Sequence, residues 1–259
     1  MLLGIIYSAI ILAACILGAV VGLGGGLFIR PALDAIGQHN VMNIAFFSST
    51  AVMCMAIVST VQKARDGTRI DARLAACVSA SAVAGGIVGN LLLEHLLAAL
   101  SRETHVQYVQ IAVTIPVLIL SLVLTEKRTL RCELAHKALI IPIGVGLGIV
   151  ASFLGIGGGP LNVPLFMIFF GLRIKEAAAY SIIVILFSHL SRLVTLGLTV
   201  GYGGFDLALL PFVIAAAAVG GLLGAKLNKV FSEKTVKRLF QAALCLVILM
   251  NLANAFFFL

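Results

Sequence analysis

Two glycine-rich motifs with the same internal spacing are the stretches of this sequence best suited to binding chemistry. They read GLGGGLFIRPAL at residues 22–33 and GIGGGPLNVPLF at residues 155–166, and the second begins 133 residues after the first. The three consecutive glycines of the motifs are Gly24, Gly25, Gly26 and Gly157, Gly158, Gly159. Each glycine weakens a helix by roughly 1 kcal/mol relative to alanine, so each motif is predicted to break an apolar helix. A broken helix leaves free backbone N–H groups, which are suited to holding an anion.

The short segments that follow the glycines are predicted to begin at Leu27 and Pro160, and proline is favoured at the first position of a helix. Two such N-termini would bring N–H groups and partial positive charge toward one place. Asn162 lies just inside the second segment, where its amide could donate to a bound oxyanion, and Ile29 stands at the equivalent place in the first. The site is therefore expected to be asymmetric. The alternative is that the glycines only let helices pack closely.

A predicted helix over residues 174–199 carries a polar stripe. At 100° per residue its members fall within about 40° of one line; they are Ser181, Ser188, Arg192, Thr195 and Thr199. The equivalent positions of the predicted helix over residues 41–62 are Ser48, Met55, Ser59 and Gln62. An arginine inside a membrane span is rare and usually faces the protein interior, which makes Arg192 a candidate ligand of an anion. The alternative is that its side chain extends to the outer surface, because the helix ends only seven residues later.

His189 lies about 80° from this stripe and could titrate as a proton-coupling group. The alternative is a histidine that is hydrogen bonded to a neighbouring carbonyl. No acidic residue lies deep inside a predicted span, which disfavours cation transport and a carboxylate proton relay. No metal-ligand spacing, nucleotide-binding loop or nucleophile motif is present. We therefore predict no enzymatic activity, no metal and no cofactor.

The composition predicts that these residues lie on membrane helices. Of the 259 residues, 61% are hydrophobic and 11% charged, whereas soluble domains are about 25% charged. Most of the long uncharged stretches reach the roughly 20 residues that a helix needs to cross a bilayer. We predict an all-α polytopic membrane protein with helical segments over residues 2–23, 27–37, 41–62, 72–97, 105–125, 138–156, 160–171, 174–199, 205–227 and from 235 onward. The net charge of +8 is ascribed to basic cytoplasmic loops rather than to binding of nucleic acid.

The duplication extends beyond the glycine motifs. Phe47-Ser48 matches Tyr180-Ser181 at the same separation, and AGGIVGN at residues 84–90 resembles VGGLLGA at residues 219–225. We predict two homologous four-segment repeats, residues 1–130 and 131–259, in one integral membrane domain. Each repeat would begin with a glycine-broken helical hairpin.

The charged loops predict how the repeats are oriented. Loops 63–73, 126–137 and 226–238 are the basic ones, which places them in the cytoplasm and both termini outside. Residues 2–37 and 138–171 must then be hairpins that return to their own side. Each half crosses the membrane an odd number of times, so the repeats are inverted, an arrangement in which transporters bind substrate near the midplane. Eight full spans are the alternative, and they would put loop 226–238 outside.

The duplicated G-x-GGG-x4-P element, GLGGGLFIRP and GIGGGPLNVP, resembles that of the sulfite exporter TauE/SafE family, and the resemblance covers essentially the whole chain. It implies a multi-pass protein of the bacterial inner membrane that moves small sulfur-containing anions such as sulfite or organosulfonates. The residues by themselves support an anion but not sulfur. We therefore predict a carrier or facilitator whose partners are a small anionic solute and membrane lipid, with no nucleic acid. A passive anion channel and a membrane scaffold or biogenesis factor without a solute remain alternatives, and a homo-oligomer stays open.

Overall fold

The computed structural model describes residues 2–68, 70–99, 103–126, 140–153, 159–199 and 201–257, and these contain helices and no strand. The first half supplies α1 (Leu2–Val21), α2 (Gly26–Ile36), α3 (Val41–Arg65), α4 (Ala72–Ala99) and α5 (Glu103–Glu126). The second half supplies α6 (Ile140–Phe153), α7 (Asn162–Phe169), α8 (Ile174–Thr199), the short 3-10 helix η2 (Leu207–Leu209), α9 (Leu210–Val230) and α10 (Glu233–Phe257). Among the described residues, seven helices are long and apolar enough to cross a membrane. The predicted all-α polytopic membrane protein is confirmed.

The first glycine break lies slightly earlier than the three consecutive glycines suggest. Helix α1 ends at Val21 and α2 already begins at Gly26, so the break comprises Gly22 to Gly25. The backbone explains the shift, because Gly22 and Gly24 have φ values of +80° and +68°, a region that glycine enters far more readily than other residues. In the second motif, Gly157 and Gly158 lie outside the described residues.

Helices α1 and α2 form a hairpin that returns to its starting end. An added Cβ on Gly18 would lie 2.5 Å from the backbone nitrogen of Gly25, so the chain folds back against α1 directly after the break. At the other end of the hairpin, the Tyr7 hydroxyl and His39 Nδ1 are 2.8 Å apart. The start of α1 and the end of α2 therefore lie at the same end of the molecule.

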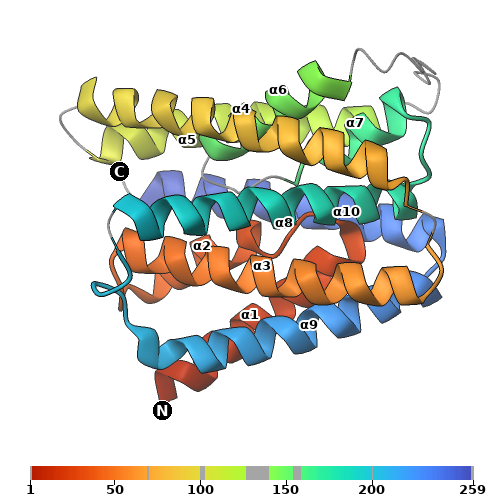
Figure 1. The fold of residues 1–259 in the computed structure, drawn as a ribbon. Coiled ribbons are helices and arrows are strands. Elements are labelled where there is room, and N and C mark those ends of the chain that lie inside the picture. The colour runs from red at the N-terminus through yellow and green to blue at the C-terminus, as the bar shows by residue number, and fades with distance from the viewer. Residues whose placement is uncertain are drawn as a thin grey trace.

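Two parallel helix pairs join the halves of the chain, and both use glycines at the contact (Figure 1). In the pair α1 and α9, a Cβ added to Gly4 would lie 3.3 Å from the Phe212 ring, and a Cβ added to Gly224 would lie 2.6 Å from Ile16 O. In the pair α4 and α6, a Cβ on Gly89 would lie 2.5 Å from Ile149 O. The glycines of AGGIVGN and VGGLLGA thus let two backbones approach closely, as small residues do in membrane helices.

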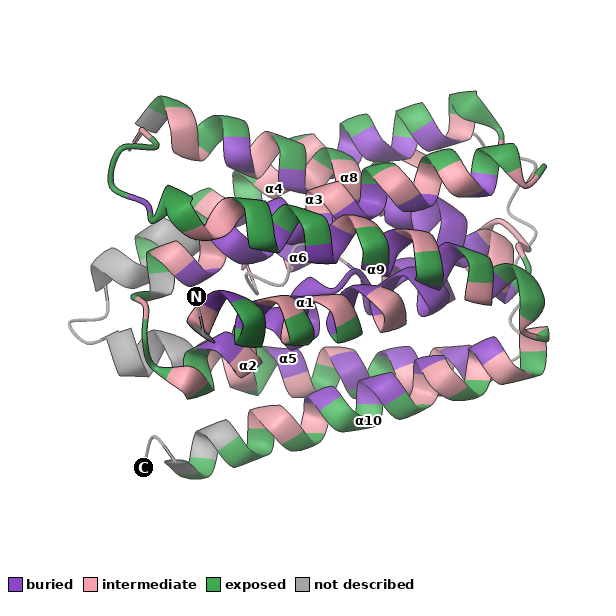
Figure 2. Ribbon diagram, turned by 90° about the horizontal axis from the view of Figure 1, so that it is seen from below, coloured by how far each residue is buried: buried purple, intermediate pink, exposed green. Residues whose placement is uncertain are grey.

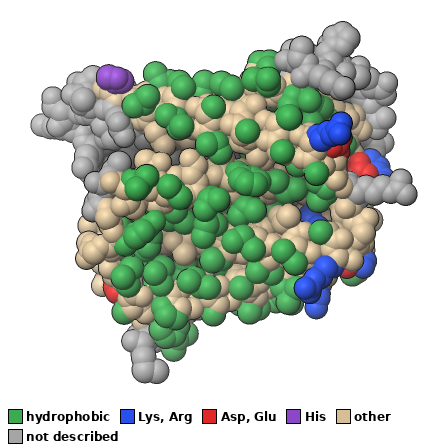
Figure 3. Space-filling model, in the orientation of Figure 1, with side chains coloured by type: hydrophobic (Ala, Val, Ile, Leu, Met, Phe, Trp, Pro, Cys, Tyr) green, Lys and Arg blue, Asp and Glu red, His purple; other side chains and the backbone are tan. Residues whose placement is uncertain are grey.

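The basic segments gather at one end of the molecule, called here the basic end. Helices α3, α5 and α9 end there and α4, α8 and α10 begin there. Lys229 pairs with Asp66 at 2.8 Å, and Lys237 pairs with Glu126 at 3.1 Å. On the face in Figure 3, the Lys and Arg side chains cluster at this end and hydrophobic side chains cover the broad middle. Eight full spans would have put loops 63–73 and 226–238 at opposite ends, and the Lys229–Asp66 pair rules this out.

Buried residues line the inward faces of the helices, while exposed residues face outward (Figure 2). Many of the outward residues are large and apolar, such as Ile57, Ile87 and Leu249. This is the pattern expected when the molecule is surrounded by lipid rather than water. The break between α1 and α2 is buried, so it lies inside the bundle and not at its surface.

Candidate functional site

Gly159 of the second motif meets the first glycine break inside the bundle. An added Cβ on Gly159 would overlap the backbone carbonyl of Leu23, so the second motif lies directly against the first. The Ser181 hydroxyl of α8 donates to Gly22 O at 2.6 Å and so holds the first residue of the first break against α8. Residues that are 133 or more positions apart in the sequence thus surround one point of the structure.

Glycine is needed in the first break because α8 passes very close to it. An added Cβ on Gly22 would lie 2.5 Å from Ala178 Cα, and one on Gly24 would lie 3.2 Å from Ile185 Cδ1. Both positions also have positive φ, which side-chain-bearing residues avoid. The same glycines therefore both break the helix and let α8 pack closely. The prediction of a helix break and the alternative of close packing do not exclude each other.

Asn162 is the first residue of α7 and is only 2% exposed. Its Nδ2 has no hydrogen-bond partner among the described residues. The carbonyl of Pro160, just before it, is taken by the Ser121 hydroxyl of α5. A buried donor without a partner costs about 1–3 kcal/mol, so the Asn162 amide is available to a ligand beside the junction of the breaks.

His189 on α8 is 3% exposed, and neither of its ring nitrogens has a hydrogen-bond partner within the described part of the chain. The alternative of a histidine bonded to a neighbouring carbonyl is therefore not what the structure shows. Helices α7 and α8 are joined by a four-residue connection and run antiparallel, with Phe166 and Tyr180 ring centroids 6.0 Å apart. His189 lies nine residues after Tyr180, which at 100° per residue is the opposite side of α8 from the one that meets α7.

The serines of the predicted stripe have different roles. The Ser181 hydroxyl holds the first break, whereas the Ser188 hydroxyl donates to Val184 O of its own helix at 2.9 Å. Ser48 is buried on α3, and its neighbour Ser49 has a buried hydroxyl without a partner among the described residues. Ser49 could not be singled out from the sequence, because the repeat pairs Ser48 with Ser181 and gives Ser49 no polar counterpart.

Arg192 is half-buried on α8 and interacts electrostatically with Arg30 of α2. Helix α2 packs inside the bundle, with Ile29 and Leu33 fully buried. The sequence analysis did not select Arg30, because its segment is too short to span a membrane and its charge was therefore not counted as lying inside one. The signal was present in the motif itself, where arginine directly precedes Pro31.

The structure thus brings Gly24, Gly159, Asn162 and Ser181 to one region. Gly25 and Gly26 carry the chain from the break into α2, and a Cβ on Gly25 would lie 3.2 Å from Cys15 Sγ. Among the described residues, no group of three or more His, Cys, Asp or Glu side chains could hold a metal ion. The chemistry that the region offers is hydrogen-bond donation and positive charge.

A sequence comparison supplies the family. The profile described as sulfite exporter TauE/SafE matches residues 7–251, nearly the whole chain. The chain belongs to the TauE/SafE family. It is also similar to the probable membrane transporter protein YunE of Bacillus subtilis (strain 168), with 26% identity over 265 residues that cover 91% of this chain and 92% of the relative. No solved structure matches it.

Membership of the TauE/SafE family and the seven membrane-length helices together make this a multi-pass transporter of the bacterial inner membrane. A transporter in lipid handles a small solute, and the junction of the two breaks is where broken-helix transporters bind theirs. In this TauE/SafE protein the buried Asn162 amide lies three residues after Gly159, beside that junction.

Proposed function

We propose that this TauE/SafE protein carries a small oxyanion of the sulfite or organosulfonate type, bound where the two glycine breaks meet. The observation that carries the proposal is the Asn162 amide, which is buried beside the junction and has no partner among the described residues. An oxyanion would accept its hydrogen bond. The restriction to sulfur oxyanions rests on the name of the family.

The charges around the junction favour an anion over a cation. Arg30 of α2 and Arg192 of α8 interact electrostatically, and two positive charges on these helices attract an anion and oppose a cation. No Asp or Glu is among the buried residues that the structure describes. A cation carrier would need buried carboxylates or carbonyls in their place.

His189 is a second buried donor without a partner among the described residues. A neutral imidazole has one N–H and one acceptor nitrogen, so it can donate to the anion. A protonated imidazole would donate from both nitrogens and add a charge. We propose that the anion contacts Asn162 while the glycine N–H groups beside it complete its coordination, and that His189 is a further donor on the path along α8.

The experiment compares two asparagine variants in purified protein reconstituted into nanodiscs, with radiolabelled sulfite as the probe. Asn162→Leu removes the unpartnered amide at similar volume. Asn251→Leu is the control, because the Asn251 amide already donates to Val247 O within α10 at 2.8 Å. We expect Asn162→Leu to weaken sulfite binding about tenfold, the loss of one hydrogen bond to a charged group, and to leave stability unchanged or higher. Asn251→Leu should bind as the wild type does. Equal affinity of the two variants would remove Asn162 from the site.

A further inference from the structure

A second group of cations lies at the basic end, around a cavity of about 490 Å³. The cavity is bounded by the end of α3, the start of α8, the end of α9 and the start of α10. Its charged lining residues are Lys63, Asp66, Arg173, Lys175, Glu176, Lys229 and Glu233. The cavity lies on the basic-end side of the first break, and its lining residue Asn228 donates to Val20 O just before that break. Lys63 is further away: Val52, which lies 3.5 Å from a Cβ added to Gly24, is 11 residues before it on α3, about 16 Å at 1.5 Å per residue.

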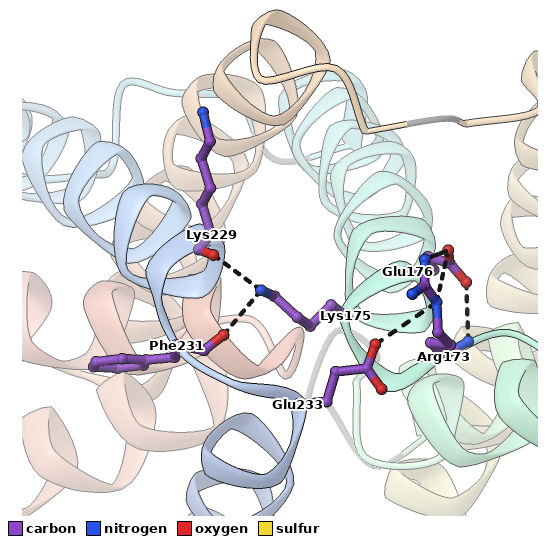
Figure 4. Close-up of polar contacts among 6 residues, drawn as sticks. All are labelled: Arg173, Lys175, Glu176, Lys229, Phe231 and Glu233. Carbon is purple, nitrogen blue, oxygen red and sulfur yellow. Dashed lines mark hydrogen bonds and ion pairs between the residues drawn. The ribbon is translucent and has the colours of Figure 1, made fainter.

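The carboxylates in this lining are already paired with two of its cations. Asp66 accepts from Lys229 at 2.8 Å and from the Gln62 amide at 3.1 Å, and these two bonds hold the pKa of the Asp66 carboxyl below its usual range. Arg173 lies 2.8 Å from Glu176 and 3.6 Å from Glu233, and Glu176, followed by Glu233, raises the pKa of Arg173. Figure 4 shows Arg173 between its two carboxylates.

Lys175 has no carboxylate among these pairs. Its Nζ donates to the backbone carbonyls of Lys229 and Phe231 at 3.0 and 2.9 Å, as Figure 4 shows. These carbonyls belong to the penultimate residue of α9 and to the first residue after it, so the ammonium group caps a helix C-terminus. Its hydrogen bonds hold the group in place, and no carboxylate of the described residues forms an ion pair with it.

Lys63 is the unusual residue of the cavity. It is only 4% exposed, and its Nζ has no hydrogen-bond partner among the described residues. It also interacts electrostatically with Lys175, a second positive charge. A buried ammonium next to another one is unfavourable, since burial removes its hydration and its neighbour repels it. A negatively charged ligand would reverse both effects.

We propose that a small oxyanion binds in this cavity between Lys63 and Lys175, as a second anion site at the basic end of the transporter. The inference rests on the proposed function only for the identity of the anion. Water could occupy the donors of Lys63 but would leave the two charges unbalanced, whereas a singly or doubly charged oxyanion balances them and accepts several hydrogen bonds. The volume admits such an ion together with part of its hydration shell.

The position of the site suggests what it does for transport. A cluster of uncompensated positive charge at an opening raises the local concentration of anions and speeds their capture. The anion would be held at the basic end before it moves to the junction of the breaks. The site would therefore affect the concentration dependence of transport more than its maximal rate.

The experiment measures sulfite binding to the full-length protein in nanodiscs, at constant ionic strength. Lys63→Met removes the charge and keeps the length of the side chain. Lys226→Met is the control. Lys226 is an exposed lysine on the last turns of α9, and it does not line the cavity. We expect two bound anions per wild-type chain, the second lost or weakened at least about tenfold in Lys63→Met and unchanged in Lys226→Met. Lys63→Met should also be the more heat-stable protein without sulfite, and it should gain less stability from sulfite than the wild type.

The possible results separate this inference from the proposed function. If the wild type binds no sulfite, the proposed function fails together with the second site. If the wild type binds sulfite and Lys63→Met binds it identically, the second site is wrong and the site at the breaks stands. If Lys63→Met does not fold, Lys175→Met takes its place with the same expected loss, and unchanged binding in that variant contradicts the proposal.

Discussion

Asn162 and His189 are buried polar residues whose side chains have no hydrogen-bond partner among the described residues, unlike Ser181. Sequence patterns could predict that Asn162, His189 and Ser181 lie on a polar interior. They could not predict that the Ser181 hydroxyl is used to hold Gly22 O while the Asn162 amide is left over. A hydrogen-bond partner is set by tertiary packing, and here it comes from a residue 159 positions away.

Lys63 shows a second limit of sequence-based prediction, which is the burial of a charged side chain. Lys63 was assigned to a basic loop, although α3 continues to Arg65 and buries it. The error has a physical cause, because a lysine near a helix end normally extends its ammonium into water. In this protein α8 and α9 enclose that end instead, which no local pattern indicates.

Arg192 is predicted to contact the anion as well. Arg192→Lys keeps a positive charge and loses the planar fork, so sulfite affinity should fall moderately. Arg192→Gln loses the charge, and its affinity should fall about tenfold or more, because hydrogen bonds to charged groups are roughly twice as strong as neutral ones. Sulfite binding by the two variants measures this. If the side chain instead extends to the outer surface, both variants will bind sulfite as the wild type does.

At the scale of the elements, most helix boundaries could be predicted to within a few residues. Apolar segments bounded by charged loops or glycines leave little freedom once the membrane is recognised. The first break was the harder case, since three glycines in a row drew attention to Gly26, which is helical, and away from Gly22, whose φ is +80°. The close approach of α8, which the sequence does not show, decides which glycines leave the helix.

Two glycines provide a matched test of the first break. Gly24 and Gly37 both have φ of +68°, but a Cβ on Gly24 would meet Ile185 at 3.2 Å whereas one on Gly37 would meet nothing within 4 Å. Alanine at either position adds about 1–2 kcal/mol of left-handed strain, so both variants should be less stable by a similar amount. Only Gly24→Ala should also lose sulfite affinity, because the break would shift. Equal affinity in Gly24→Ala and Gly37→Ala, measured with the binding assay, would mean that the break does not shape the site.

At the scale of the whole molecule, we propose that residues 1–130 and 131–259 are inverted repeats. The pairing of α1 with α9 and of α4 with α6 supports this, because each pair joins the first helix of one half to the fourth helix of the other. The pairs also start at opposite ends, α1 and α9 away from the basic end and α4 at it. This exchange between halves could not be predicted, since the repeat specifies which segments are alike but not which ones touch.

The inverted arrangement has a consequence for topology. Position 232 lies at the basic end, where Lys175 holds the carbonyl of Phe231. If basic loops are cytoplasmic, a cysteine in place of Ser232 should react with a membrane-impermeant thiol reagent only from the cytoplasmic side. Labelling from the periplasmic side would overturn the orientation.

The central claim is that this TauE/SafE transporter carries a small oxyanion through a site at its glycine breaks, and sulfite counterflow tests it most directly. Proteoliposomes are loaded with unlabelled sulfite under anaerobic conditions and diluted into a trace of labelled sulfite. A carrier exchanges the two, so label should accumulate transiently above its outside concentration, with saturation as the loaded sulfite rises. Asn162→Leu should reduce this accumulation severalfold and Asn251→Leu should not. Flux without accumulation would indicate a passive channel, and the absence of any protein-dependent flux would contradict sulfite transport altogether.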